Sequence, residues 1–339
     1  MTDTHPKDGL AIEMRGVTKI FGPDPDTALA LLREGKSKDE VQTETNHVVG
    51  LNNVSLDIAQ GQIFVVMGLS GSGKSTLIRH VNRLIDPTSG EIFVNGADVT
   101  KMSLDELRTF RRSQIAMVFQ KFGLLPHRSV IDNVAYGLEV RGLKKEERKE
   151  KAAHWIEVVG LKGYENSRPR ELSGGQQQRV GLARALAMDT DILLMDEAFS
   201  ALDPLIRTEM QDELIRLQEQ HQRTVVFISH DLDEAMRIGD RIAIMQGGRV
   251  VQVGTPDDIL RNPANDYVHS FFRGVDISKV LAAKDIAKRT QVTLIDRPDL
   301  GPRAAIKLLD DFDRDYGFVL GRGRTLAGVV STTTLEALR

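Results

Sequence analysis

The chain has 339 residues, of which 41% are hydrophobic and 27% charged, and its net charge is −3. This length predicts about two domains, and the slight acidity, without a long basic block, argues against a nucleic-acid partner. The absence of cysteine excludes disulfides, thiol catalysis and thiolate metal ligands. No apolar stretch approaches the ~18 residues that cross a bilayer, so we expect any membrane role to come through a partner.

The first strand is predicted from Ile12 to Phe21, where apolar and polar residues alternate up to an aromatic residue. A helical insert is predicted after it, at 22–50. Its apolar part favours one short helix, and Ser37 with Glu40 has capping-box spacing for a second. We expect a small helical hairpin beside the glycine-rich loop that follows the next strand.

The segment 68–76, GLSGSGKST, follows the apolar run 63–67 and precedes a helix-forming segment. Glycine permits backbone conformations that turn successive N–H groups inward, so the loop and the first helical turn form a cradle for a polyphosphate. In this motif Lys74 reaches the β- and γ-phosphates, and the hydroxyl of Ser75 holds Mg²⁺. A tight turn with a solvent-facing lysine is the alternative for an isolated match, but here the strand and helix stand where the motif needs them. The residues predicted to bind the nucleotide are Gly68, Ser70, Gly71, Ser72, Gly73, Lys74, Ser75 and Thr76.

Two further layers are predicted around this core. The run 92–94 enters the turn Asn95-Gly96, which indicates an antiparallel layer. From Lys121 to about Arg170 the pattern is mainly helical and highly charged, which predicts a helical subdomain spanning about 121–178.

The α/β core resumes with a helix over 172–188 and the apolar strands 192–195 and 224–229. Strands that alternate with helices predict a largely parallel sheet, in which ligands bind at the carboxyl ends of the strands. Asp196-Glu197 and His230 follow the two strands directly, so we expect them at the same edge as the glycine-rich loop.

The helix over 172–188 opens with Leu172-Ser173-Gly174-Gly175-Gln176. A serine hydroxyl, small residues and a helix N-terminus form a second anion site, although a plain helix cap is a common use of serine. This segment resembles the signature motif of the ATP-binding cassette (ABC) superfamily. The resemblance implies an α/β P-loop NTPase core with an antiparallel β subdomain and an inserted helical subdomain. It also implies that two chains pack head-to-tail, so that each ATP lies between one phosphate loop and the partner's signature. The residues that would act across this dimer are Ser173, Gly174, Gly175, Gln176 and, in the D-loop, Asp203.

The resemblance gives roles to the remaining candidate residues. Asp196, at the end of an apolar strand, suits a carboxylate that coordinates Mg²⁺, and Glu197 resembles the general base that polarises the attacking water. Gln120 resembles the Q-loop glutamine, which contacts Mg²⁺ and the water, and His230 resembles the switch histidine that bonds the γ-phosphate. Phe21 stands where the family stacks an aromatic ring on adenine, although an aromatic strand end is also typical of a core.

A narrower resemblance is to the ATP-binding subunit of glycine betaine/proline importers. It rests on the insert after Phe21 and on the segments 196–207, 262–267 and 272–277. It implies a homodimer of ATP-hydrolysing subunits on the cytoplasmic face of the inner membrane, with integral-membrane permease subunits and an external substrate-binding protein. The apolar segment 122–130 would receive the permease's coupling helix, although an internal subdomain contact would look similar. Choline or another quaternary amine is the alternative substrate.

The ABC ATPase domain is predicted to span 1–276, and the remainder, 277–339, resembles a single CBS regulatory unit. The pattern there predicts a helix at 304–309 and strands at 316–320 and 325–331. CBS units normally occur in pairs, and Thr334 stands where nucleotide-binding units often carry an aspartate. We therefore expect regulation by ionic strength or self-association rather than nucleotide binding.

Two other classes of function are alternatives for a chain with these motifs. A soluble cassette ATPase that acts on nucleic acid or ribosomes usually carries two cassettes in one chain, or a coiled-coil or basic insert, and this chain has neither feature. A regulatory protein that binds nucleotide without turnover would not need Glu197 and His230.

Overall fold

Residues 9–272, 293–295, 300, 302–311, 316–320 and 326–333 are described by the computed structural model. The chain divides into two units, residues 1–280 and 281–339. The predicted domain boundary after 276, and all but the first residue of the segment 272–277, lie outside the described residues. No helix in the described part is both long and apolar enough to cross a membrane.

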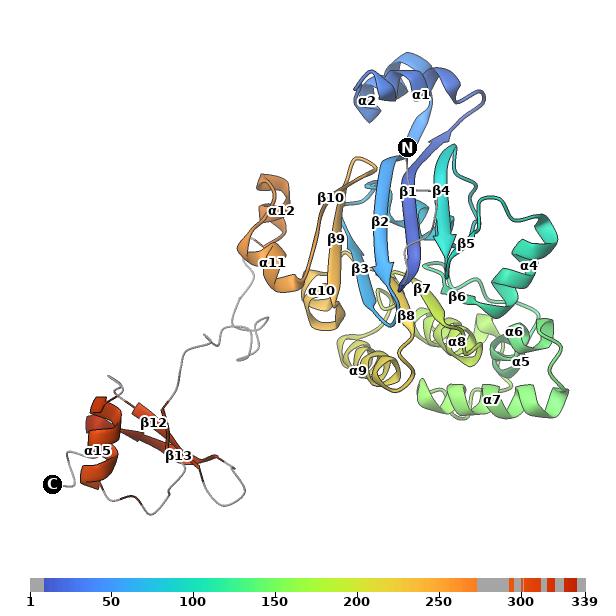
Figure 1. Cartoon of the computed structure of the whole chain (residues 1–339). Coiled ribbons are helices and arrows are strands. Elements are labelled where there is room, and N and C mark those ends of the chain that lie inside the picture. Colours follow the sequence, from blue (N-terminus) through green and yellow to red (C-terminus); the bar gives the residue numbers. More distant parts are fainter. Residues whose placement is uncertain are drawn as a thin grey trace. The chain divides into compact units, whose positions relative to one another are not determined.

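A six-stranded sheet with the order β10-β9-β3-β8-β7-β6 forms the centre of the first unit (Figure 1). Its strands are β3 (Ile63–Met67), β6 (Ile115–Val118), β7 (Ile192–Asp196), β8 (Thr224–Ile228), β9 (Arg241–Gln246) and β10 (Arg249–Gly254). Neighbouring strands are parallel except for β10, which is antiparallel to β9. Every residue of β3, β7 and β8 is buried, which explains why these strands are continuous apolar runs in the sequence.

An antiparallel sheet with the order β2-β1-β4-β5 covers one face of the central sheet. Its strands are β1 (Leu10–Phe21), β2 (Val48–Ala59), β4 (Ser89–Val94) and β5 (Ala97–Asp98). Asn95 and Gly96 have φ angles of 46° and 79°, as the predicted two-residue turn requires. Phe64 and Val66 of β3 share one core with this sheet, and the helices α3 (Lys74–Val81) and α4 (Leu104–Ser113) pack into the same core.

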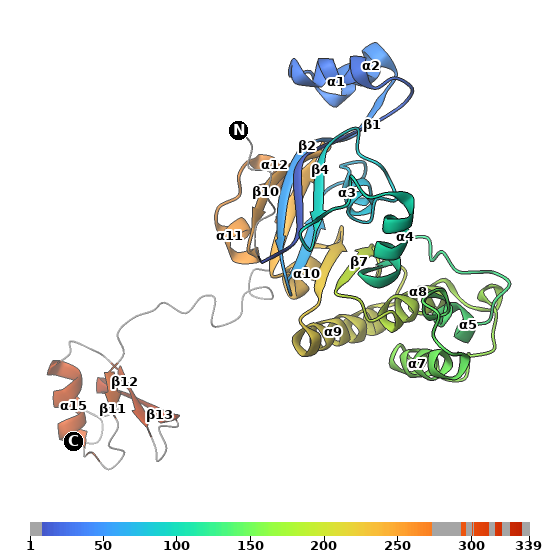
Figure 2. The same cartoon turned by 45° about the vertical axis from the view of Figure 1, so that its right-hand side comes forward.

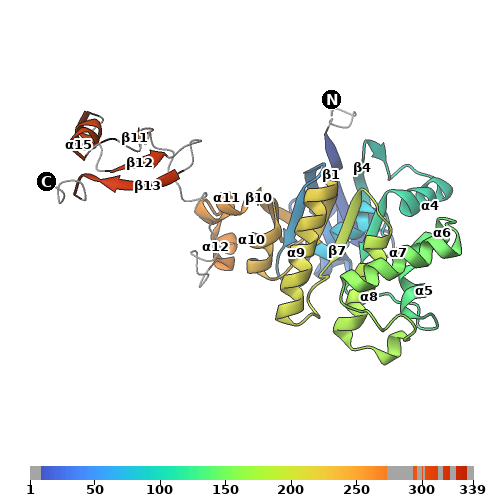
Figure 3. The same ribbon diagram turned by 90° about the horizontal axis from the view of Figure 1, so that it is seen from below.

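Helices cover the other face of the central sheet, where Val65 and Met67 of β3 point into a second core. The helices whose apolar residues join this core are α5 (Val130–Val134), α6 (Tyr136–Val140), α7 (Lys145–Val158), α8 (Gly174–Ala187), α9 (Pro204–His221) and α10 (Leu232–Ile238), and the first three pack on one another and on α8. The structure confirms the mainly helical pattern between 121 and 170. Helices α7 and α8 pack against each other (Figure 3), so α8, which continues well beyond 178, belongs to both the helical subdomain and the core.

The insert is a helical hairpin at the ends of β1 and β2 (Figure 2). It consists of α1 (Asp26–Arg33) and α2 (Lys38–Thr45), which confirms the two predicted helices. The last three residues of the predicted insert, 48–50, instead begin β2. The hairpin has a small core of its own, formed by Ile20, Ala28, Leu32, Val41 and Val49.

Two helices close the first unit, α11 (Pro256–Arg261) and α12 (Asp266–Phe271). The second unit contains β11 (Thr293–Ile295), α15 (Pro302–Asp311), β12 (Tyr316–Leu320) and β13 (Leu326–Ser331). Its sheet has the order β11-β12-β13, and α15 buries Ala305, Ile306 and Leu309 in a small cluster that includes Val319 and Val330. The predicted helix and both predicted strands are present, whereas the short β11 was not predicted. Thr334 lies outside the described residues.

Candidate functional site

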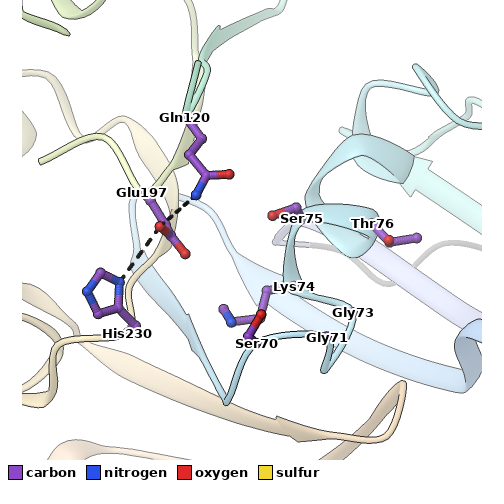
Figure 4. Close-up of a pocket in the computed structure, with 9 residues that line it drawn as sticks. All are labelled: Ser70, Gly71, Gly73, Lys74, Ser75, Thr76, Gln120, Glu197 and His230. Carbon is purple, nitrogen blue, oxygen red and sulfur yellow. Dashed lines mark hydrogen bonds and ion pairs between the residues drawn. The ribbon is translucent and has the colours of Figure 1, made fainter. Parts of the chain in front are cut away.

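A cavity of about 510 Å³ lies where β3, β6, β7 and β8 end. Figure 4 shows Gln120, Glu197 and His230 on one side of it and the glycine-rich loop on the other. Four separate strand ends therefore supply one site, as expected for a parallel sheet. The residues that line the cavity are Ser70, Gly71, Gly73, Lys74, Ser75, Thr76, Gln120, Glu197 and His230.

The phosphate loop is shaped by positions that only glycine can occupy. Gly73 has a φ angle of 103°, and a β-carbon there would lie 2.5 Å from the carbonyl oxygen of Gly50. The Lys74 side chain folds back into the loop, where its Nζ donates to the carbonyl oxygens of Gly68 (2.8 Å) and Leu69 (3.1 Å). Burial lowers the pKa of Lys74, while the charges of Glu197 and Asp196 oppose that effect. A polyphosphate would offer this buried ammonium group the charged oxygen partners that it lacks in the loop.

Asp196 is fully buried at the end of β7. One of its oxygens accepts a hydrogen bond from Ser75 Oγ (2.9 Å) and the other accepts from Arg79 Nη2 (3.1 Å). Sequence reasoning missed Arg79. It lies four residues after Ser75 on α3, and that spacing places both on one helix face. The Ser75 hydroxyl and the Asp196 carboxylate are hard oxygen donors of the kind that Mg²⁺ prefers, so this pair fits the metal.

Glu197 stands at the centre of the opposite wall. Its Oε2 accepts a hydrogen bond from Gln120 Nε2 (2.9 Å) and lies 3.7 Å from His230 Nδ1. Its backbone has a φ angle of 49° and is tied to β8 by a bond from its N–H to the Ile228 carbonyl (3.2 Å). A non-glycine residue in this conformation is uncommon and must be held by its surroundings. The three predicted catalytic side chains therefore meet around one carboxylate oxygen.

The loop that carries Gln120 is held by a residue that sequence reasoning also missed. Arg184, on α8, donates to the carbonyl oxygens of Gly123 (2.7 Å) and Phe122 (3.0 Å). Phe122 has a φ angle of 23°, so this segment too departs from the usual backbone conformations. Desolvation lowers the pKa of Arg184. A largely buried guanidinium on the helix that starts with the signature segment thus fixes the backbone just after Gln120.

The signature residues and Asp203 do not line this cavity. Ser173 and Gln176 form a reciprocal capping box at the start of α8, and Asp203 caps α9 through the N–H of Ile206 (3.1 Å). Ser173 and Asp203 therefore do serve as helix caps within their own chain. Ser173, Gly174 and Asp203 are also exposed, so a second chain can reach them.

Phe21 ends β1 with 39% of its surface exposed, so it is not a core residue. Its ring lies over Gly50, where a β-carbon would be 2.7 Å from Cε2 of Phe21 and 3.2 Å from Cγ2 of Thr76. The ring does not line the cavity, but it borders the helix that begins at the phosphate loop.

Comparison with known proteins places this geometry in a family. The ABC transporter model matches residues 51–200. The chain is 60% identical over 329 residues to the glycine betaine/proline betaine transport system ATP-binding protein ProV of Salmonella typhimurium. The aligned residues make up 97% of this chain and 82% of that relative. It is 52% identical over 329 residues to the trimethylamine N-oxide transport system ATP-binding protein TmoW of Ruegeria pomeroyi, covering 96% of each. Among solved structures, the ATP-binding cassette MJ0796, a dimer in a post-hydrolysis state bound to ADP and phosphate, is 32% identical with a TM-score of 0.64, covering 72% of this chain and 98% of that one.

Proposed function

The chain belongs to the ABC transporter family, and from that premise we propose that it is the ATP-binding and ATP-hydrolysing subunit of an importer for glycine betaine and proline betaine. The observation that carries this proposal is the 60% identity to a glycine betaine/proline betaine transport ATPase over 97% of the chain. The cavity supports the ATPase part of the proposal independently, because it joins a phosphate loop to a carboxylate that accepts a hydrogen bond from Gln120 and lies beside His230.

The geometry supports a direct hydrolysis mechanism. The loop N–H groups and Lys74 bind the phosphates of ATP, and Glu197 accepts a proton from a water molecule as its oxygen attacks the γ-phosphorus. The bond from the γ-phosphorus to the bridging oxygen breaks, which leaves ADP and inorganic phosphate. Gln120 and His230 orient the Glu197 carboxylate, and His230 also bonds the γ-phosphate.

Mg²⁺ would be held by Ser75, by Asp196 and, once nucleotide is present, by Gln120. When bound it neutralises charge on the β- and γ-phosphates. In the described part of the chain no three His, Asp or Glu residues cluster to hold a metal ion.

We propose that two copies of the chain pack head-to-tail. The signature residues cap α8 away from their own chain's cavity and are exposed there, and the related cassette MJ0796 forms a dimer bound to ADP and phosphate. In this arrangement Ser173, Gly174, Gly175 and Gln176 reach the partner's γ-phosphate, and Asp203 lies across the interface. Closure of the dimer on ATP drives the transport cycle.

The relatives are ATP-binding proteins of transport systems. We therefore place this chain on the cytoplasmic face of the inner membrane, beneath integral-membrane permease subunits that receive substrate from an external binding protein. The segment 122–130 is the proposed permease contact. Within it Pro126 and His127 are exposed, while Leu124 packs against the second core and is less available to a partner.

Trimethylamine N-oxide is a second candidate substrate, because one of the relatives serves a transport system for it. The relative from Ruegeria pomeroyi, 52% identical, is a trimethylamine N-oxide transport protein. Glycine betaine, choline and trimethylamine N-oxide all carry a trimethylated nitrogen, so substrate choice would rest with the permease and the binding protein.

The unit 281–339 is proposed to be a CBS-like regulator that responds to ionic strength, and its helix packed on a small sheet supports that assignment.

The sharpest test of the ATPase assignment is the Glu197→Gln variant of the full chain. Loss of a general base typically costs about 10²–10⁴ in rate, so we expect this loss in kcat while ATP binding persists and ATP-bound dimers accumulate in size-exclusion chromatography. Glu146→Gln, at an exposed position on α7, is the matched control and should behave as wild type. Wild-type hydrolysis that is absent, or a Glu197→Gln variant as active as wild type, would contradict the proposal.

A further inference from the structure

The helical hairpin 22–47 is fixed to the strand that ends at Phe21. Phe21 and Val48 are direct partners in the β1–β2 ladder, so the hairpin leaves and re-enters the sheet at one point. At that neck the His47 ring contacts the carbonyl oxygens of Thr45, at 2.9 Å, and of Pro23. The hairpin's own core includes residues of both strands. Its position relative to the nucleotide site is therefore set by packing.

Helix α2 begins at a residue that reaches the phosphate loop. Ser37 Oγ accepts from the N–H of Glu40 (3.3 Å), and the Glu40 carboxylate accepts from the N–H of Ser37 (2.7 Å). This capping box makes Lys38 the first residue of α2. From there Lys38 Nζ donates to the carbonyl oxygen of Gly71, at 3.2 Å, and Gly71 lines the cavity.

The charge of Lys38 is not neutralised by a neighbouring carboxylate. Across the residues that the structure describes, no carboxylate lies within ion-pair distance of its ammonium group, whereas Lys36 in the same hairpin is paired with Glu44 at 2.5 Å. A cation that lies beside the phosphate loop without a carboxylate partner attracts a bound polyphosphate through space, and the attraction is strongest at low ionic strength.

We propose that Lys38 is a further nucleotide-binding residue, and that the insert serves to bring a second ammonium group to the phosphate loop beside Lys74. The inference rests on the proposed function, in which this loop binds ATP. Lys38 does not itself line the cavity; it contacts the carbonyl oxygen of Gly71, and the loop that carries Gly71 faces Gln120, Glu197 and His230 across the cavity (Figure 4). The charge of Lys38 therefore strengthens binding of ATP and ADP without changing the hydrolysis step.

Steady-state ATP hydrolysis by the full chain tests this, with Lys38→Met, Lys38→Arg and the matched control Lys36→Met. At about 0.1 M salt, where the Debye length is roughly 10 Å, we expect Lys38→Met to raise the KM for ATP about 3- to 10-fold with kcat unchanged. At about 1 M salt, where that length is roughly 3 Å, the difference should fall below about twofold. Lys38→Arg and Lys36→Met should follow wild type at both salt concentrations.

Equal KM values for Lys38→Met and wild type would overturn the inference, and so would an equal rise in Lys36→Met, which would indicate only a change in net charge. A wild-type chain that neither binds nor hydrolyses ATP would instead refute the proposed function. In a second variant, residues 22–47 are replaced by Asn-Gly, a turn that joins the register partners Phe21 and Val48 directly. If this variant folds, as its melting curve will show, it should match Lys38→Met, and a wild-type KM would also overturn the inference.

Discussion

The proposed adenine contact at Phe21 depends on the absence of a side chain at Gly50. In a Gly50→Ala variant the new methyl group would start 2.7 Å from Cε2 of Phe21 and 3.2 Å from Cγ2 of Thr76. β-Carbons essentially never lie as close to another atom as the first distance, so the Phe21 ring must shift from its present position. Because Phe21 is 39% exposed, its ring can move, and we expect less than the ~1–3 kcal/mol of an overpacked core to be lost from the free energy of unfolding.

Loss of the stacked ring sets the size of the effect on ATP. Aromatic stacking contributes about 0.5–1.5 kcal/mol beyond buried area, which corresponds to a roughly 2- to 13-fold rise in the KM for ATP. We expect Gly50→Ala and Phe21→Ala each to raise KM within this range, with kcat nearly unchanged. The KM of the double variant should not exceed the higher of the two single-variant KM values. In a chain without the Phe21 ring, the new methyl group has no ring to displace.

The assay is a double-mutant cycle on the KM for ATP, with thermal melting of all four proteins as the control for folding. Fully additive effects would show that the methyl group acts elsewhere, for example on Thr76. An unchanged KM in Phe21→Ala would refute the adenine contact itself.

Two further predictions concern residues away from the ligand. Arg184→Met removes both donors to the backbone after Gln120, so we expect kcat to fall about 10-fold with KM for ATP within about twofold, and partial rescue in Arg184→Lys. Equal changes in kcat and KM would contradict a positioning role. Burial raises the pKa of Glu234 above the ordinary 4.5, so its stabilising contribution is present below about 4.5 and is lost as pH rises through the folded pKa. As pH rises from about 4.5, the free energy of unfolding should therefore fall less in Glu234→Gln than in wild type. The same dependence of this free energy on pH in both proteins would contradict the prediction.

Much of the central fold could be predicted because burial leaves a direct mark on the sequence. The strands β3, β7 and β8 are buried on both faces and appear as apolar runs. Ser37 with Glu40 marks the start of α2 through local hydrogen bonds alone. The strand β11 has only three residues, too few for a period-2 pattern to stand out.

The site residues that directly follow a strand could be predicted from the sequence. Those that reach the site through contacts between distant parts of the chain could not. Glu197 and His230 each follow an apolar strand, so the parallel-sheet rule brings them together. Arg184 bonds backbone more than 60 positions away in the chain, at Phe122 and Gly123. Lys38 reaches Gly71 only because the hairpin packs at the strand ends, and no spacing rule in the sequence reports that approach.

The central claim is that this chain hydrolyses ATP to drive import of glycine betaine. The most direct test is uptake of labelled glycine betaine after a salt upshift, in cells that lack this gene and carry either the wild-type chain or Glu197→Gln. We predict that only the wild-type chain restores uptake. Equal uptake with both chains would contradict the role of Glu197, and no uptake with either, while the purified wild-type chain still hydrolyses ATP, would contradict the substrate.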